Sequence, residues 1–143
     1  MKYKNNELVA WIDITTHCNA GCPQCHRTNP NSLKKVEWLP LVQWSLTPVD
    51  MMKIKKFELC GTWGDPIMNK DVKEIVKYII ENSNCYIQIN TNGGIRDEGW
   101  WWELGVIGRK RLEVYFDIEG ITQEMHSKYR QKVDLEKLKE NIH

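Results

Sequence analysis

The alternation of strand-like and helix-like segments constrains the fold of this chain more than any other feature of its sequence. Runs rich in β-branched and aromatic residues predict strands at 8–14, 57–60, 86–90 and 112–118. After the second run, apolar residues recur at helical spacing over residues 72–80, which predicts a helix. Strand–helix pairs in series form right-handed βαβ units with a parallel sheet. The sequence therefore predicts an α/β fold with about four parallel strands.

Capping residues predict where several helices begin. Thr47 precedes a short helix that we expect to end near Lys55. Asn69 is expected to cap the isoleucine-rich helix described above. Asp97 and Asp134 begin two further predicted helices.

The length and charge of the chain narrow the range of its partners. With 143 residues, it fits one domain spanning residues 1–143. Its 20 basic and 19 acidic residues give a net charge of +1, so we expect no nucleic-acid or membrane-surface partner. No apolar run approaches the roughly 20 residues that span a bilayer, and the N-terminus lacks a signal-peptide pattern. We therefore expect a cytoplasmic protein, whose cysteines bind metal or react rather than form disulfides.

Three cysteines lie close together directly after the first predicted strand. Cys18, Cys22 and Cys25 have the spacing C-x-x-x-C-x-x-C, with Gly21 between the first two. Iron–sulfur clusters need soft thiolates that converge on one face, and backbone N–H groups of such a loop can donate to the cluster sulfurs. Three ligands leave one iron open, which is typical of a catalytic rather than a structural metal site.

Other functions are compatible with parts of this loop. Cys22, Cys25 and His26 match the C-x-x-C-H pattern of c-type haem attachment, but that would require export and leaves Cys18 unexplained. A zinc site could use the three cysteines with His17 or His26. A redox-active C-P-x-C pair is a further alternative, although that motif normally opens a helix.

Polar and glycine-rich segments follow each of the later predicted strands. They are 61–66 (G-T-W-G-D-P), 90–93 (N-T-N-G) and 116–120 (F-D-I-E-G), and His126 and Arg130 lie further along the chain. In parallel α/β folds ligands bind at the carboxyl ends of the strands, so these segments are expected to meet the cysteine loop there.

The cysteine loop and these segments, in this order, resemble the radical S-adenosylmethionine (radical SAM) superfamily. The resemblance implies a [4Fe–4S] cluster on Cys18, Cys22 and Cys25, with S-adenosylmethionine chelating the open iron. It implies reductive cleavage of that cofactor to a 5′-deoxyadenosyl radical, which abstracts hydrogen from an unknown substrate, a peptide or a small molecule. An electron donor such as flavodoxin or ferredoxin would reduce the cluster.

The resemblance also implies contacts for the cofactor. The segment holding Gly61, Gly64, Asp65 and Pro66 resembles the family's G-G-E-P, which contacts the amino group of the methionine, with Asp65 in place of the usual Glu. Glycines let the backbone approach a ligand closely. Asn90 and Asn92 lie in the segment that resembles the family's T-N-G, and Asp117 lies in the one that resembles S-I-D-G.

The resemblance implies that Asp117 accepts from the ribose hydroxyls. It also implies that Arg130, in a segment similar to H-x-x-x-R, pairs with the methionine carboxylate. One position departs from the family, because Gln24 stands where an aromatic residue usually precedes the third cysteine. His26 or another side chain is then expected to contact the adenine. Trp63 is expected either to line the cofactor pocket or to pack in the core.

Taken together, the strands and motifs predict a partial, open (β/α) barrel of the TIM type. Four units cannot close a barrel, so the last strand is expected to present an open edge. We expect the chain to be the N-terminal portion of a radical SAM core domain, truncated, with a C-terminal region or a second chain covering that edge. A non-catalytic metal-binding module (zinc or Fe–S), or an inactive fragment, is the alternative function. Cys60 and Cys85, on predicted strands, are expected to be small buried apolar residues.

Overall fold

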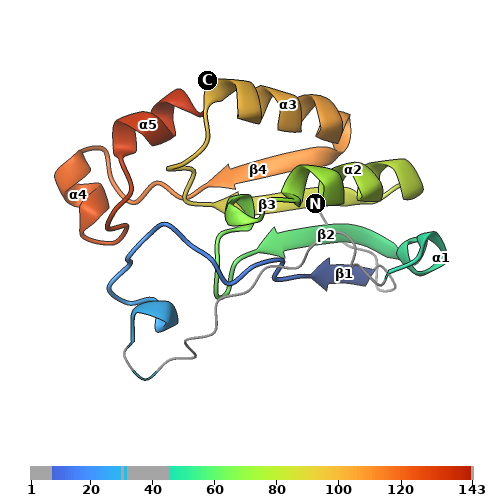
Figure 1. Cartoon of the computed structure of the whole chain (residues 1–143), viewed down its shortest axis with the longest axis horizontal. Coiled ribbons are helices and arrows are strands. Elements are labelled where there is room, and N and C mark those ends of the chain that lie inside the picture. The colour runs from blue at the N-terminus through green and yellow to red at the C-terminus, as the bar shows by residue number, and fades with distance from the viewer. Residues whose placement is uncertain (1–7, 30, 32–45, 143) are drawn as a thin grey trace.

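The computed structural model describes residues 8–29, 31 and 46–142 and shows one parallel sheet. Its strands lie in chain order, β1-β2-β3-β4, and each pairs in parallel with the next (Figure 1). They span Leu8–Trp11, Ile54–Cys60, Tyr86–Thr91 and Leu112–Phe116. The predicted α/β fold with four parallel strands is confirmed.

Helices α1 (Pro48–Met51), α2 (Val72–Asn82) and α3 (Glu98–Gly108) lie between successive strands, and α4 (Gln123–Ser127) and α5 (Leu135–Glu140) follow β4. Short 3-10 turns are η1 (His26–Thr28), η3 (Pro66–Met68) and η4 (Arg109–Arg111). Figure 1 shows α2 and α3 on the same side of the sheet, where they also contact each other.

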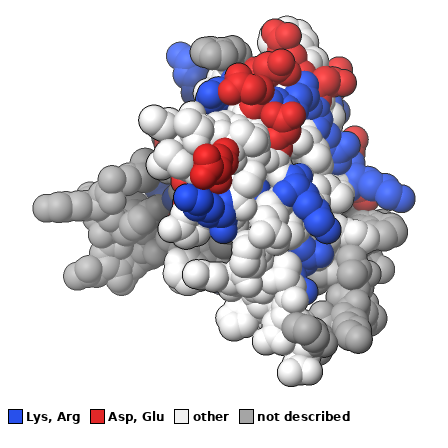
Figure 2. Space-filling model, turned by 90° about the vertical axis from the view of Figure 1, so that its left-hand side faces the viewer, with Lys and Arg blue, Asp and Glu red and all other residues white. Residues whose placement is uncertain are grey.

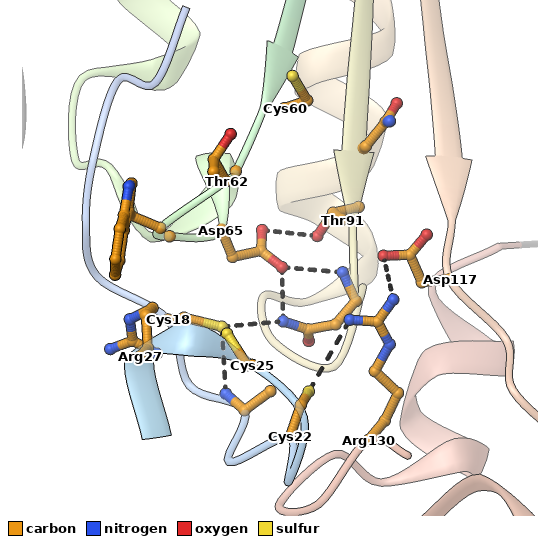
Figure 3. Close-up of a pocket in the computed structure, with 16 residues that line it drawn as sticks. Cys18, Cys22, Cys25, Arg27, Cys60, Thr62, Asp65, Thr91, Asp117 and Arg130 are labelled. Atoms are coloured by element: carbon orange, nitrogen blue, oxygen red, sulfur yellow. Dashed lines mark hydrogen bonds and ion pairs between the residues drawn. The ribbon is translucent and has the colours of Figure 1, made fainter. Parts of the chain in front are cut away.

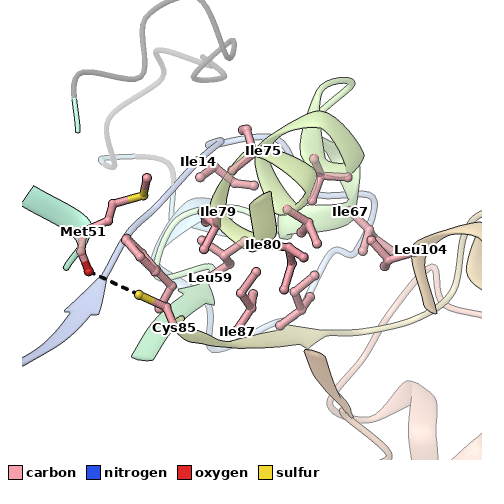
Figure 4. Packing of buried hydrophobic residues seen from close by; sticks show 14 residues of the cluster. Ile14, Met51, Leu59, Ile67, Ile75, Ile79, Ile80, Cys85, Ile87 and Leu104 are labelled. Atoms are coloured by element: carbon pink, nitrogen blue, oxygen red, sulfur yellow. Dashed lines mark hydrogen bonds between the residues drawn. The ribbon is translucent and has the colours of Figure 1, made fainter. Parts of the chain in front are cut away.

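The hydrophobic core lies between these two helices and the sheet. Phe57 and Leu59 of β2 and Ile87 and Ile89 of β3 point to this side and are fully buried, and the isoleucines of α2 are buried beside them (Figure 4). Burying one such side chain stabilises the fold by about 1.5–3 kcal/mol. Side chains alternate between the two faces of a strand, so Glu58, Gln88 and Glu113, which are in register, lie on the other face.

Three predicted capping residues have the expected role. Thr47 forms a capping box with Asp50, Asp97 accepts from the backbone N–H of Trp100, and Asp134 accepts from two backbone N–H groups of α5. The helix after Thr47 is shorter than predicted, however, because β2 begins at Ile54, where it pairs with β1. Strand pairing thus overrides the local helical pattern. The predicted strands 8–14 and 112–118 are also shorter, ending at Trp11 and Phe116.

The prediction that Asn69 caps the helix after it is wrong. The residue before α2 is Asp71, and Asn69 is fully buried two positions earlier. Its side chain accepts from the Asp71 N–H at 2.8 Å and donates to the carbonyl of Ile14 at 2.7 Å. Asn69 therefore ties the segment after β1 to the start of α2. The helix α4 was not predicted, since its few residues carry no long apolar repeat.

The edge strands of the sheet are β1 and β4. Within the described residues β1 and β4 each pair with one strand only, as expected for a partial barrel.

Figure 2 shows the side on which α4 and α5 lie, with acidic side chains gathered beside lysines and arginines. In α5 these form exposed pairs such as Lys139–Glu136, each worth little in water. No helix in the described part of the chain is long and apolar enough to cross a membrane.

Candidate functional site

A cavity of about 240 Å³ lies at the carboxyl ends of the strands (Figure 3). It is lined by the cysteine loop after β1 and by the segments after β2, β3 and β4. Of the residues predicted for the site, Pro66 does not line it. Those that do are Cys18, Cys22, Cys25, Gly61, Gly64, Asp65, Asn90, Asn92, Asp117 and Arg130. Residues separated by more than a hundred positions in the chain thus meet at one place.

The cysteine loop is held by residues from distant parts of the chain. Its Gly21 N–H donates to the carbonyl of Gln131 at 2.9 Å. The Cys18 sulfur accepts from the Ala20 N–H at 3.4 Å and from the Asn92 side chain at 3.8 Å. All three loop cysteines are free thiols. Burial raises the pKa of the Cys18 thiol, so a bound metal would be needed to hold it as a thiolate at neutral pH.

The chemistry of the donor set fits an iron–sulfur cluster. Within the described ranges, no group of three or more His, Cys, Asp or Glu side chains is placed to hold one metal ion. In a [4Fe–4S] cluster each cysteine binds its own iron, and N–H donors to sulfur are typical surroundings. Cys18 and Cys22 both have such nitrogen donors.

The carboxylate of Asp65 is buried beneath the cavity and is 4% exposed. It accepts from the Thr91 hydroxyl at 2.8 Å, from the backbone N–H of Asn92 at 2.8 Å and from that of Ile67 at 3.2 Å. The Asn92 side chain donates to it as well. Burial raises the pKa of Asp65, while these hydrogen bonds oppose the rise. The acid therefore locks the segments after β2 and β3 together.

The glycines after β2 are required by close backbone contacts. A Cβ atom on Gly64 would lie 2.2 Å from the carbonyl oxygen of Thr15, and one on Gly61 would lie 1.5 Å from that of Gly64. Any side chain at these positions would have to displace backbone. The Asp65 N–H also donates to the His17 carbonyl at 2.7 Å. The turn after β2 is thus packed directly against the chain that leads into the cysteine loop.

Asp117 and Arg130 are brought together after β4. The Arg130 guanidinium lies 2.7 Å from the Asp117 carboxylate and 3.2 Å from that of Glu119. Burial raises the pKa of Asp117, and the positive charge of Arg130 opposes the rise. The other terminal nitrogen of Arg130 lies 3.8 Å from the Cys22 sulfur. His126, fully buried, accepts from the Glu119 N–H at 3.2 Å and positions this segment.

Several residues that line the cavity were not assigned to it from the sequence. Cys60 was expected to be buried, but it is partly exposed and lines the cavity, so that prediction is wrong. The strand period carries the signal, because Cys60 lies on the same face as Glu58. Trp63 lines the cavity, with its ring 6.1 Å from that of His26, and Arg27 lines it too. Gln24 is exposed, whereas Cys85 is buried as predicted.

Comparison with curated proteins finds relatives that are longer than this chain. No family model matches it. A probable GTP 3′,8-cyclase of Methanothermobacter thermautotrophicus is 29% identical over 131 residues, covering 92% of this chain and 41% of that protein. A probable GTP 3′,8-cyclase of Methanocaldococcus jannaschii is 30% identical over 131 residues, covering 89% of this chain and 41% of that protein. The chain therefore spans less than half the length of these relatives.

A third relative and two solved structures extend the comparison. The 7,8-dihydro-6-hydroxymethylpterin dimethyltransferase of M. jannaschii is 26% identical over 123 residues, covering 80% of this chain and 23% of that protein. A structure of histidine-tagged anSMEcpe with bound AdoMet matches with a TM-score of 0.69 at 19% identity, covering 95% of this chain and 39% of that one. A structure of BtrN with AdoMet and 2-DOIA matches with a TM-score of 0.58 at 16% identity. That match covers 80% of this chain and 46% of that one. The predicted partial, open TIM-type barrel is confirmed by this likeness in fold.

Proposed function

We propose that this chain, which belongs to the radical SAM superfamily, holds a [4Fe–4S] cluster on Cys18, Cys22 and Cys25 and binds S-adenosylmethionine beside it. The observation that carries the proposal is the cavity in which the three cysteines meet the segments after β2, β3 and β4. The names of the matched structures support it, because both were solved with AdoMet.

Cys18, Cys22 and Cys25 would hold the cluster, which would supply the electron for reductive cleavage of S-adenosylmethionine and so allow hydrogen abstraction from a substrate. The chain's own residues bind and orient the cofactor. Gly61 and Gly64 let it approach the backbone after β2. Asn90 faces the cavity from β3 and Asp117 from the segment directly after β4, where both can accept from hydroxyl or ammonium groups of the cofactor.

Two predicted residues have other principal contacts. The carboxylate of Asp65 is occupied by hydrogen bonds from Thr91, Asn92 and Ile67, so we assign it the role of positioning its neighbours. Pro66, buried at the start of η3, supports that turn.

The substrate and partners belong to this proposal as well. The names of the curated relatives, a GTP cyclase and a pterin dimethyltransferase, favour a small molecule over a peptide. A flavodoxin or ferredoxin would donate the electron, and a cytoplasmic location would keep the thiols reduced. The open edge of β4 is suited to pair with a further strand, from a C-terminal region or a second chain.

Anaerobic reconstitution with iron and sulfide tests the proposal. We expect about four iron and four sulfide per chain, an EPR signal after reduction, and 5′-deoxyadenosine when S-adenosylmethionine is added. Cys18→Ala, Cys22→Ala and Cys25→Ala should each lose the cluster, while Cys60→Ala, a cysteine of the same cavity outside the loop, should keep it. Stoichiometric zinc in the purified protein would favour the non-catalytic metal-binding module instead.

A further inference from the structure

Arg130 joins the acidic end of β4 to the cysteine loop. One terminal nitrogen of its guanidinium contacts Asp117 at 2.7 Å and Glu119 at 3.2 Å, and the other lies 3.8 Å from the Cys22 sulfur. Figure 3 shows the guanidinium of Arg130 between Asp117 and Cys22. We propose that Arg130 sets the reduction potential of the cluster by placing a positive charge against Cys22, an inference that rests on the proposed function.

The charge is placed where solvent screens it weakly. The side chain of Arg130 is 26% exposed, and burial of this extent leaves a charge less screened than one in bulk water. Reduction adds one negative charge to a cluster. A nearby positive charge stabilises the reduced form more than the oxidised form, and it therefore raises the potential.

The two acids determine how much of this charge the cluster experiences. Asp117 and Glu119 hold the guanidinium in place and also offset its field. Removing the arginine should lower the potential, whereas removing Asp117 should raise it, because the positive charge is then less compensated. If Arg130 only supported the fold, the two substitutions would not be expected to shift the reduction potential in opposite directions.

Cys22 differs in this respect from the first cysteine of the loop. Cys18 accepts from neutral groups, the N–H of Ala20 and the side chain of Asn92. The charge of Arg27 also acts on Cys18, but the Arg27 Nε donates to the Thr16 carbonyl at 3.1 Å. Direct contact between a guanidinium and a loop sulfur is therefore observed at Cys22.

An EPR-monitored redox titration of the reconstituted protein, without S-adenosylmethionine, tests the inference. Arg130→Gln should lower the ratio of reduced to oxidised cluster about tenfold at a fixed solution potential, equal to about 59 mV for one electron. Asp117→Asn should shift the midpoint upward. Lys128→Gln, which loses the same charge from an exposed side chain near α4, should match the wild-type midpoint.

A cluster-loaded Arg130→Gln protein with a wild-type midpoint would overturn the inference and leave the proposed function intact. A downward shift in Asp117→Asn would also overturn it, and this outcome can still be measured if Arg130→Gln fails to hold a cluster. If the wild-type chain binds no cluster, the proposed function fails and the inference fails with it.

Discussion

The carboxylate of Asp65 accepts hydrogen bonds from both the backbone and the side-chain nitrogen of Asn92. These residues follow β2 and β3, and the Asn92 side chain also donates to the side-chain amide oxygen of Asn19 at 2.9 Å in the cysteine loop. The pair therefore connects three of the segments that line the cavity. Its loss should affect stability and cluster binding together.

Replacing Asp65 with alanine should lower the free energy of unfolding by about 3 kcal/mol, because the buried N–H of Asn92 and hydroxyl of Thr91 would lose their acceptor. Urea unfolding of the metal-free protein measures this. Glu81→Ala, which removes an exposed carboxylate paired to Lys77 at 3.9 Å, should cost less than about 0.5 kcal/mol. An equal loss of unfolding free energy in the two variants would show that the hydrogen bonds to Asp65 contribute no more than an exposed ion pair.

Gly64→Ala should destabilise the fold by about 1–3 kcal/mol, because its Cβ would lie 2.2 Å from the Thr15 carbonyl. Gly105→Ala is the matched control, since nothing lies within 4 Å of a Cβ there. That change, inside α3, should instead stabilise by about 0.5–1 kcal/mol. Thermal unfolding of both variants would show shifts in opposite directions, and a Gly64→Ala protein as stable as wild type would refute the close contact.

Stability should depend on pH through Asp65. Burial raises its pKa in the folded protein, with the nearby Asp117 charge adding to the rise. Between the ordinary carboxyl pKa and this raised value, the folded state binds more protons than the unfolded state. The free energy of unfolding contributed by Asp65 therefore falls as pH rises through that window.

Urea unfolding of wild type and Asp65→Asn across the acid range isolates this contribution. The wild-type free energy of unfolding minus that of the variant should decrease with rising pH in the window. A difference that grows with pH would mean that hydrogen bonds from Asn92, Thr91 and Ile67 outweigh burial.

Trp63→Ala should weaken binding of S-adenosylmethionine to the reconstituted protein by about 2–10-fold, the loss typical of one aromatic contact. Trp63 lines the cavity beside His26, in a chain where Gln24 precedes the third cysteine. Calorimetric titration measures the affinity. Trp102→Ala, at a side chain that is 69% exposed on α3, should bind like wild type. Equal affinities in all three proteins would exclude Trp63 from the binding site.

Much of the fold and site follows from interactions between near neighbours in the chain. The strand–helix alternation and the caps Thr47, Asp97 and Asp134 depend on residues a few positions apart, and they were predicted. Parallel strands also bring their carboxyl ends to one edge, so the meeting of Cys18 with Asp117 could be expected from order alone.

Contacts between distant residues could not be predicted in this way. The pairing of Arg130 with Asp117 and Cys22, the burial of Asp65 and the position of Cys60 in the cavity each depend on how segments pack in space. Asn69 likewise bonds the Ile14 carbonyl, 55 positions away, instead of capping its helix. A buried polar group takes whichever partner packing places beside it, and short-range patterns carry no record of that partner.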